Sequence, residues 1–491
     1  MDQKLQKALY VMLLALGLAL VFNFLFFSKQ IGISVFVFNV ALLGAVFGFA
    51  RHQKLSLQKS YWFALPILFF ALMPAVRASG FLTFLNVVAT FGLLMLLAHQ
   101  LTGTPAFLMK LRDYATLAVL VPFRMLGRGL STISKLGQIH SNVKHRDVWI
   151  RVFKGVIMAV PILIIFGALF SQADLAFSQF LGNFIHINIS ERSVQYLVLL
   201  FFAFLAGLSF LSYIFFPKNS VIPVSTSESS NTGRPESSIQ SGRSIEVLVF
   251  LSLIAALFLL FIGFQITYLF GGQANITSWG FTYAEYARRG FFELLAVAVL
   301  SLLVLLASEQ FAGTKERKDK RFLVPALVLI AEVVVVIISA FKRLSLYIDA
   351  YSLTTMRFYV AGFIILLLAL FILLAVKFVQ SKPENFFTFG TLLTGTAFLI
   401  VVNLINPDSF IANSNLKQYN QTGKIDAYYI ASLSADATSQ QIEMYDKLQG
   451  EDKKNLEGWL PNQKDRLQAQ TTHWQSANLS RSRALRLLKN Y

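Results

Sequence analysis

Long apolar runs dominate this chain of 491 residues and restrict the class of fold it can adopt. A helix that crosses a bilayer needs about 20 predominantly apolar residues. Only 14% of the residues are charged, whereas soluble domains have about 25%. The sequence therefore predicts an all-α, polytopic membrane helix bundle with about eleven spans, at 8–27, 31–50, 61–76, 81–98, 154–171, 194–216, 246–270, 290–308, 322–341, 357–379 and 386–404.

Lys and Arg are distributed unevenly between the loops. If the N-terminus is cytoplasmic, the loops on its side hold 24 of these residues and the loops on the opposite side hold 8. Loops rich in Lys and Arg face the cytoplasm. We therefore expect a cytoplasmic N-terminus and, with an odd number of spans, an extracytoplasmic C-terminus. The net charge of +18 follows from this topology and does not indicate nucleic-acid binding.

Changes in composition divide the chain into four parts. Residues 1–216 form a first membrane block of about six helices, and 244–404 form a second block of about five. Between them, 217–243 contains eight Ser and three Pro and predicts a flexible cytoplasmic linker. Residues 405–491 predict a small helical, extracytoplasmic region, with helices near 408–419, 426–434, 437–449 and 463–489, a break at Gly423 and a turn at 459–461.

The segment 99–154 is a basic connection with nine Lys and Arg residues. Its apolar stretch 115–126 is too short to span a bilayer. One interpretation is an amphipathic helix that places Arg124, Arg128 and Lys135 among the headgroups of anionic lipid on the cytoplasmic side. The other is a plain basic loop that only sets the topology.

Ionisable groups inside apolar runs are costly and are therefore candidate functional residues. Glu332 is the clearest, because it lies midway along the apolar run 322–341. A carboxyl group at this depth should be protonated or should pair with a group on another helix. It predicts either a proton or cation site or a structural contact between helices. The amides Asn23, Asn86 and Asn403 predict ordinary hydrogen bonds between helices.

A charged cluster precedes the eighth expected span. Thr282 and Glu285 have the spacing of a capping box. Glu285, Arg289 and Glu293 follow one another at intervals of four residues and would share a helix face, with Arg288 beside them. The cluster predicts either a capped helix at the interface or a binding face for an anionic or peptide partner.

A second cluster lies at 343–359, between the ninth and tenth spans. Arg343, Tyr347 and Tyr351 are four residues apart, and Asp349 and Arg357 are eight apart, which would place the last two on one side of a helix. Such a pairing predicts either a structural clamp or a site.

Motifs for catalysis and for metal binding are missing from the sequence. The chain has no cysteine, no phosphate-binding glycine loop, no His-Glu-x-x-His and no Gly-x-Ser-x-Gly. Its six histidines do not have the spacing of metal ligands. We therefore expect no cofactor, no metal and no enzymatic activity.

Three stretches carry a resemblance to a known family: 265–300 (with GFTYAEYARRGFFELLAVAVL), RLSLYIDAYSLTTMRFY at 343–359, and NPDSFIANSNLKQYNQTGKIDAYYIASLSADA at 406–437. Their order and their amino-acid sequences resemble those of an uncharacterised family of bacterial multi-pass membrane proteins, domain of unknown function 4153/4173. The resemblance implies the bacterial cytoplasmic membrane and no particular activity. Ser352 departs from it, since the family pattern has Gly there. Asp426 and Asp436 match the pattern, as do Tyr283, Glu285, Tyr286, Arg288, Arg289, Gly290, Glu293, Tyr347, Arg357, Asn406, Tyr429, Ser434 and Ala437.

These observations favour a sensor, scaffold or regulator without catalytic activity. It would act through an outer face formed by 281–293, 343–357 and the C-terminal region, with a protein of the cell envelope as its partner. The alternative is a secondary transporter of a small solute or ion that uses Glu332. The absence of a repeat between the two membrane blocks weighs against that alternative. A third hypothesis is a transferase acting on lipid-linked substrates.

Overall fold

The computed structural model describes residues 3–136 apart from 56, 58, 59 and 104, and then 191–217, 237–269, 291–316 and 319–490. These residues form helices joined by short turns, and no strand occurs among them. Nine of the described helices are long and apolar enough to cross a membrane. The expected all-α, multi-pass membrane bundle is therefore confirmed.

The described helices of the first membrane block pack around one apolar core. Val11, Phe70, Leu97 and Leu208 lie in this core and are almost completely buried. The helices are α1 (Gln3–Phe26), α2 (Ser34–His52), α3 (Ala64–Val76), α4 (Gly80–Leu101), α5 (Leu111–Leu136) and α8 (Glu191–Phe215), with short 3-10 turns at Tyr61–Phe63 and Ala106–Leu108.

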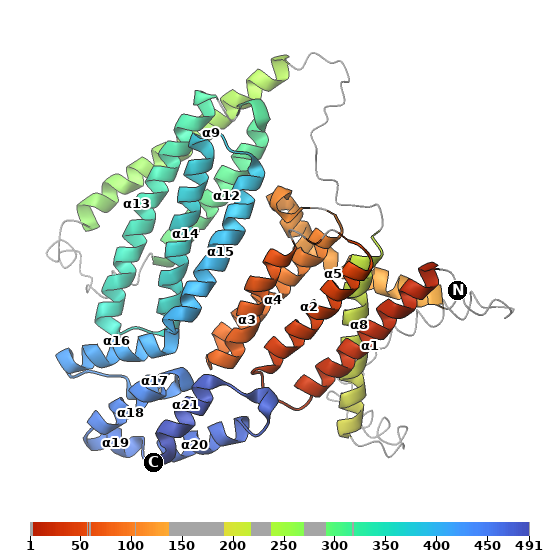
Figure 1. Cartoon of the computed structure of the whole chain (residues 1–491). Coiled ribbons are helices and arrows are strands. Elements are labelled where there is room, and N and C mark those ends of the chain that lie inside the picture. The colour runs from red at the N-terminus through yellow and green to blue at the C-terminus, as the bar shows by residue number, and fades with distance from the viewer. Residues whose placement is uncertain are drawn as a thin grey trace, which may run out of the picture.

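The second membrane block has a core of its own, in which Leu329, Val333, Leu305 and Phe371 are buried. Its helices stand beside the first block in Figure 1. They are α9 (Ser237–Leu269), α12 (Phe291–Glu316), α13 (Lys320–Tyr351), α14 (Thr355–Val379) and α15 (Glu384–Ile405).

Helix α15 joins the two blocks. Leu392, Leu399 and Ile400 of this helix pack against the core of the first block. Asn403 exchanges two side-chain hydrogen bonds with Asn86 of α4, at 2.9 and 2.8 Å. On the other side of the first block, the Asn23 amide donates to the carbonyl of Tyr196 at 3.1 Å. The expected hydrogen bonds between helices are therefore confirmed for all three asparagines.

Nine of the eleven expected spans coincide with the nine long apolar helices. The expected span 61–76 forms a shorter apolar helix, and 154–171 lies outside the described residues. Most of the expected linker 217–243 also lies outside them, although α9 already begins at Ser237.

Helix α5, in the described part of the basic segment, is longer than the apolar stretch 115–126. It continues through Pro122 and has 26 residues. Arg128 makes contacts within the first block that the sequence did not predict. Its guanidinium donates to the Tyr213 carbonyl at 2.9 Å and lies 4.3 Å from the centre of the Tyr213 ring. Contact between this segment and anionic lipid stays a prediction.

The C-terminal region, residues 407–490, consists of short helices. Gly423 ends α16 with a positive φ of 71°, as the sequence predicted. The single helix expected at 463–489 is wrong, because the chain leaves α20 at Gln470 and begins α21 at Leu479. The turn expected at 459–461 is the start of α20 instead, since Pro is tolerated in the first turn of a helix. The helices are α16 (Pro407–Thr422), α17 (Ala427–Ser432), α18 (Thr438–Lys447), α19 (Gly450–Asn455), α20 (Trp459–Gln470) and α21 (Leu479–Leu487).

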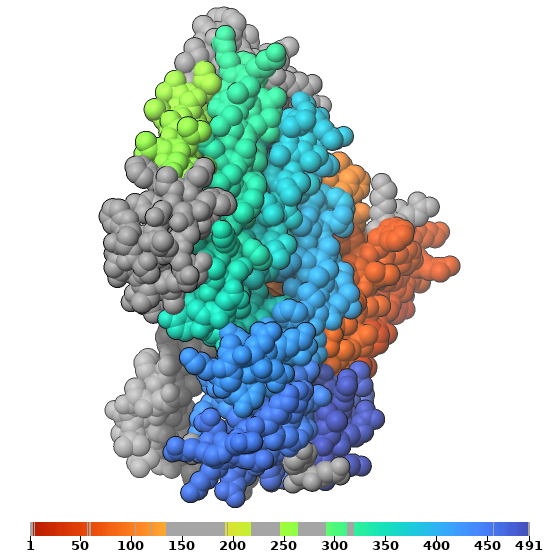
Figure 2. Space-filling model, turned by 90° about the vertical axis from the view of Figure 1, so that its left-hand side faces the viewer, coloured from red at the N-terminus to blue at the C-terminus, as the bar shows by residue number. Residues whose placement is uncertain are grey.

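The C-terminal region lies at one end of the membrane helices, below them in Figures 1 and 2. Helix α16 crosses the ends of α13, α14 and α15. Helices α17, α18 and α19 lie beneath α16 in Figure 1, and the chain then reaches the end of the first block, where the Ile33 N–H donates to the Ala477 carbonyl at 3.0 Å. We call this end of the bundle the C-terminal face.

Candidate functional site

Asp436 is the centre of the contact between the C-terminal region and the first block. The backbone N–H groups of Ala78 and Ser79, in the turn between α3 and α4, donate to its Oδ2 at 2.7 and 3.0 Å. The Ser480 hydroxyl donates to Oδ1 at 2.5 Å, and the Ser434 hydroxyl donates to Oδ2 at 3.3 Å. Successive N–H groups in a turn form a concave anion site, and here the protein's own carboxylate fills it.

Local sequence accounts for this geometry. Helix α3 ends at Val76, and a short extended segment, 77–79, leads into α4 at Gly80. The Asn478 side chain caps α21 by accepting from the Arg481 N–H at 2.8 Å. Its amide donates at the same time to the carbonyls of Pro74 and Arg77, at 2.9 and 2.7 Å. One asparagine thus starts the last helix and attaches it to the end of α3.

Asp408, in the first turn of α16, is a second carboxyl group near Asp436. It is 4% exposed, and its Oδ2 accepts from the Ser434 N–H at 3.2 Å. Burial raises the pKa of Asp408 and the charge of Asp436 raises it further, while hydrogen bonds from Ser434 and Ser79 act in the opposite direction. Asp408 is therefore a group that could hold or release a proton at this junction.

A cavity of about 600 Å³ that Asp408 helps to line lies between the turn 78–80 and helices α17 and α20. Its volume is in the range of small-molecule sites, about 300–1,000 Å³. The lining combines hydroxyl, carboxyl, guanidinium and aromatic groups, which include Thr355, Asp408, Tyr429, Trp459, Arg466 and Arg481.

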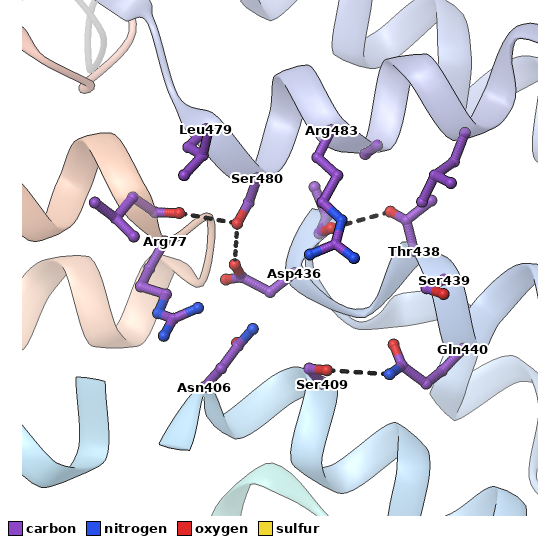
Figure 3. A pocket seen from close by; sticks show the side chains of 14 residues that line it. Arg77, Asn406, Ser409, Asp436, Thr438, Ser439, Gln440, Leu479, Ser480 and Arg483 are labelled. Atoms are coloured by element: carbon purple, nitrogen blue, oxygen red, sulfur yellow. Dashed lines mark hydrogen bonds between the residues drawn. The ribbon is translucent and has the colours of Figure 1, made fainter. Parts of the chain in front are cut away.

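A smaller cavity of about 190 Å³ lies on the other side of Asp436, between the ends of α3 and α15 and helix α21. Figure 3 shows the guanidinium groups of Arg77 and Arg483 and the amide of Asn406 directed into the same space around Asp436. The Arg77 Nε also donates to the Asn403 carbonyl at 2.8 Å, which ties the end of α3 to the end of α15.

The segment 343–357 lies directly against the C-terminal region. The Asn415 side chain accepts from the Leu353 N–H and donates to the Leu353 carbonyl, both at 2.9 Å. The Tyr429 hydroxyl lies 2.9 Å from the Thr355 hydroxyl, and the Gln418 amide donates to the Asp349 carbonyl at 2.8 Å. Two of the three stretches expected on one face are therefore assembled together.

The expected pairing of Asp349 with Arg357 along one helix is wrong. Helix α13 ends at Tyr351 and α14 begins at Thr355, so the two residues lie on different helices. The Arg357 guanidinium lies 4.1 Å from the centre of the Tyr347 ring and donates to the carbonyls of Tyr351 and Ser352. Arg357 closes the end of α13, and Asp349 is exposed.

Ser352 occupies the turn between these helices with φ 66° and ψ 165°. This backbone region is essentially restricted to glycine. The glycine that the family resemblance implies here would adopt this conformation without strain. Arg343, on the same face of α13 as Tyr347, is partly buried.

Glu332 is buried midway along α13, with 6% of its surface exposed. Neither of its carboxyl oxygens has a hydrogen-bond partner among the residues that the structure describes. The expected contact with a polar group on another helix is therefore not seen in this part of the chain.

The remaining predicted residues are distributed as follows. Glu285, Arg288 and Arg289 lie outside the described residues. Glu293 is exposed in the first turn of α12. Asp426 is an exposed helix cap that accepts from the Tyr429 N–H at 2.9 Å. Within the described ranges, no three His, Asp or Glu side chains come together to hold a metal ion.

An ion pair that the sequence reasoning missed joins two membrane helices. The Lys377 Nζ of α14 lies 2.6 Å from the Glu309 Oε2 of α12, and their side chains are 1% and 3% exposed. Lys377 is buried in the last turn of α14 and is not a loop residue. The signal was present, since both residues lie at the ends of apolar runs. Asp408, Arg77 and Arg483 were also missed, because their polar surroundings resemble those of any loop residue.

Comparison with known protein families identifies a match. A family model described as a domain of unknown function (DUF4153) matches residues 64–444, from the start of α3 to α18. No curated protein and no solved structure matches the chain. The matched range contains Arg77, Glu332, Asp408 and Asp436 and ends before Arg483.

Proposed function

Because the chain belongs to the DUF4153 family, whose defining domain has no assigned function, we propose its role from geometry: a non-enzymatic sensor, scaffold or regulator in the membrane that acts through its C-terminal face. The main support is one observation. The C-terminal region is hydrogen-bonded to both membrane blocks, through Ala78 and Ser79 on one side and through Leu353 and Thr355 on the other.

These contacts give the face a way to act on the rest of the protein. A partner or ligand that binds the C-terminal region more tightly in one arrangement than in another shifts the population of that arrangement. The region contacts α3, α4, α13 and α14. Such a shift would therefore change the packing of helices in both blocks. The cavity of about 600 Å³ offers a place for a small polar ligand.

The distribution of Lys and Arg orients this face outside the cytoplasm. Its partner would then be a protein of the cell envelope. Segment 281–293 would complete the face in this proposal.

Site-specific photocrosslinking in native membranes tests this role. A photoreactive residue replaces Tyr428, which is 56% exposed on α17. A control probe replaces Trp62, which is 77% exposed at the opposite end of the first block. We expect protein adducts at position 428, none at 62, and fewer at 428 when Asp436→Ala loosens the face. A crosslink within the chain, between position 428 and residues 281–290, would show that this third stretch also belongs to the C-terminal face. Equal adducts at 428 and 62, or none at 428, would contradict the proposal.

Glu332 supports a second candidate function, transport of a proton or small cation. A buried carboxyl group without a described partner is free to exchange a proton, and acidic residues within membrane helices often mark ion pathways. The proposal remains secondary, because it rests on a single group.

Reconstituted vesicles test the transport role with a pH-sensitive dye and an imposed membrane potential. The wild type would carry protons across the bilayer, and Glu332→Gln would abolish this flux because an amide cannot exchange a proton. The control is Glu293→Gln, at an exposed position, which should leave the flux unchanged. If wild-type vesicles behave like protein-free vesicles, Glu332 is not a proton carrier under these conditions and the transport role fails.

A further inference from the structure

The smaller cavity contains hydrogen-bond donors that the fold does not use. Arg483 is exposed, lines this cavity, and has no hydrogen bond or ion pair with any residue in the described ranges. The Arg77 guanidinium directs two of its N–H groups to the carbonyls of Asn403 and Leu404, and a guanidinium has five. Figure 3 shows both groups and the Asn406 amide turned toward one space.

The charges around this space favour a ligand with a single negative charge. Arg77 and Arg483 contribute two positive charges, and Asp436 contributes one negative charge. Asp436 already accepts from two backbone N–H groups and the Ser480 hydroxyl. Its carboxylate is therefore committed to the protein, and the guanidinium groups are left for an anion.

The position of the cavity indicates where this ligand comes from. Val76 is the last residue of α3, and Asn406 follows the last residue of α15, so the cavity lies where two apolar helices end. Leu479 and Leu487, which are 59% and 39% exposed, also line it. Leu404, the penultimate residue of α15, is 66% exposed. Lipid headgroups lie at the ends of membrane-spanning helices, and exposed leucines suit the apolar part of a lipid.

We propose that this cavity binds the phosphodiester headgroup of an anionic phospholipid with a single negative charge, of which phosphatidylglycerol is an example. Arg483 and Arg77 contact the phosphate. The volume of about 190 Å³ holds about six water-sized groups, at about 30 Å³ each, which suits a headgroup and is small for a larger solute. A lipid bound here would connect α3, α15 and α21.

Lipid retention by the full-length protein tests the site. The protein is reconstituted with equal amounts of phosphatidylglycerol and phosphatidylcholine, and the lipid that stays bound is measured by native mass spectrometry. We expect phosphatidylglycerol to be retained in preference, and Arg483→Ala to weaken its binding about tenfold, the loss of one charge-assisted contact. Arg486→Ala is the matched control, because Arg486 is exposed on the same helix and does not line the cavity.

Thermal unfolding provides a second readout with the same variants. Phosphatidylglycerol should raise the Tm of the wild type and of Arg486→Ala, and should raise that of Arg483→Ala much less. Equal retention of the two lipids, or equal effects of the two arginine variants, would overturn the site. If soluble glycerol phosphate raises the Tm as much as phosphatidylglycerol does, the assignment to a lipid is wrong.

Discussion

Asp436→Ala is expected to release the C-terminal region from the first membrane block and to lower the free energy of unfolding by about 2–4 kcal/mol. The alanine would leave the N–H groups of Ala78 and Ser79 without their acceptor, and the Ser480 hydroxyl would keep only the Val76 carbonyl, at 2.9 Å. A buried donor that loses its partner costs about 1–3 kcal/mol. The expected change is a lower Tm together with faster proteolysis at 471–478, the connection between α20 and α21.

Asp426→Ala is the matched control for this prediction. Asp426 also caps a helix of the C-terminal region, but it is exposed and accepts from one N–H, that of Tyr429. Loss of such a cap costs about 1 kcal/mol. Asp436→Asn keeps one carbonyl oxygen and should fall between the two. If Asp436→Ala and Asp426→Ala unfold at the same temperature, Asp436 does not hold the face together.

Lys377→Ala is expected to be the most destabilising single change in the second block, by about 3–5 kcal/mol. Lys377 and Glu309 are 2.6 Å apart, and their side chains are 1% and 3% exposed. Lys377→Ala removes the partner that lies 2.6 Å from the buried Glu309 carboxylate, and breaking a buried ion pair by removing one side chain is strongly destabilising. Thermal unfolding of the purified protein in detergent would show this as a lower Tm.

Two comparisons separate this effect from a general sensitivity to substitution. The double variant Glu309→Leu, Lys377→Met replaces both charges by apolar groups and should regain most of the lost stability. Lys447→Ala breaks a pair of similar length, 2.8 Å from Glu443, whose side chains are 38% and 53% exposed. Such an exposed helical pair contributes about 0.3–0.5 kcal/mol. A double variant as unstable as Lys377→Ala would show that the pair has a role beyond charge compensation.

The features that could be predicted from the sequence are those that depend on neighbours along the chain. An apolar run of about 20 residues can bury its backbone polar groups in a bilayer only as a helix. This rule alone located the nine long helices of the described part. The helix break at Gly423 and the burial of Glu332 within α13 follow from equally local patterns.

The candidate site depended on contacts that no local pattern contains. Asp436 lies more than 350 residues from the turn at 78–79 that it binds, and Glu309 lies 68 residues from Lys377. Asp349 and Arg357 had suitable spacing for a pair, but the helix ends between them. Hydropathy determines which segments enter the membrane. The packing of the helix ends decides which polar groups meet at the C-terminal face. A carboxylate or guanidinium at a helix end has several possible partners of similar chemistry within reach. Only the tertiary structure selects among them.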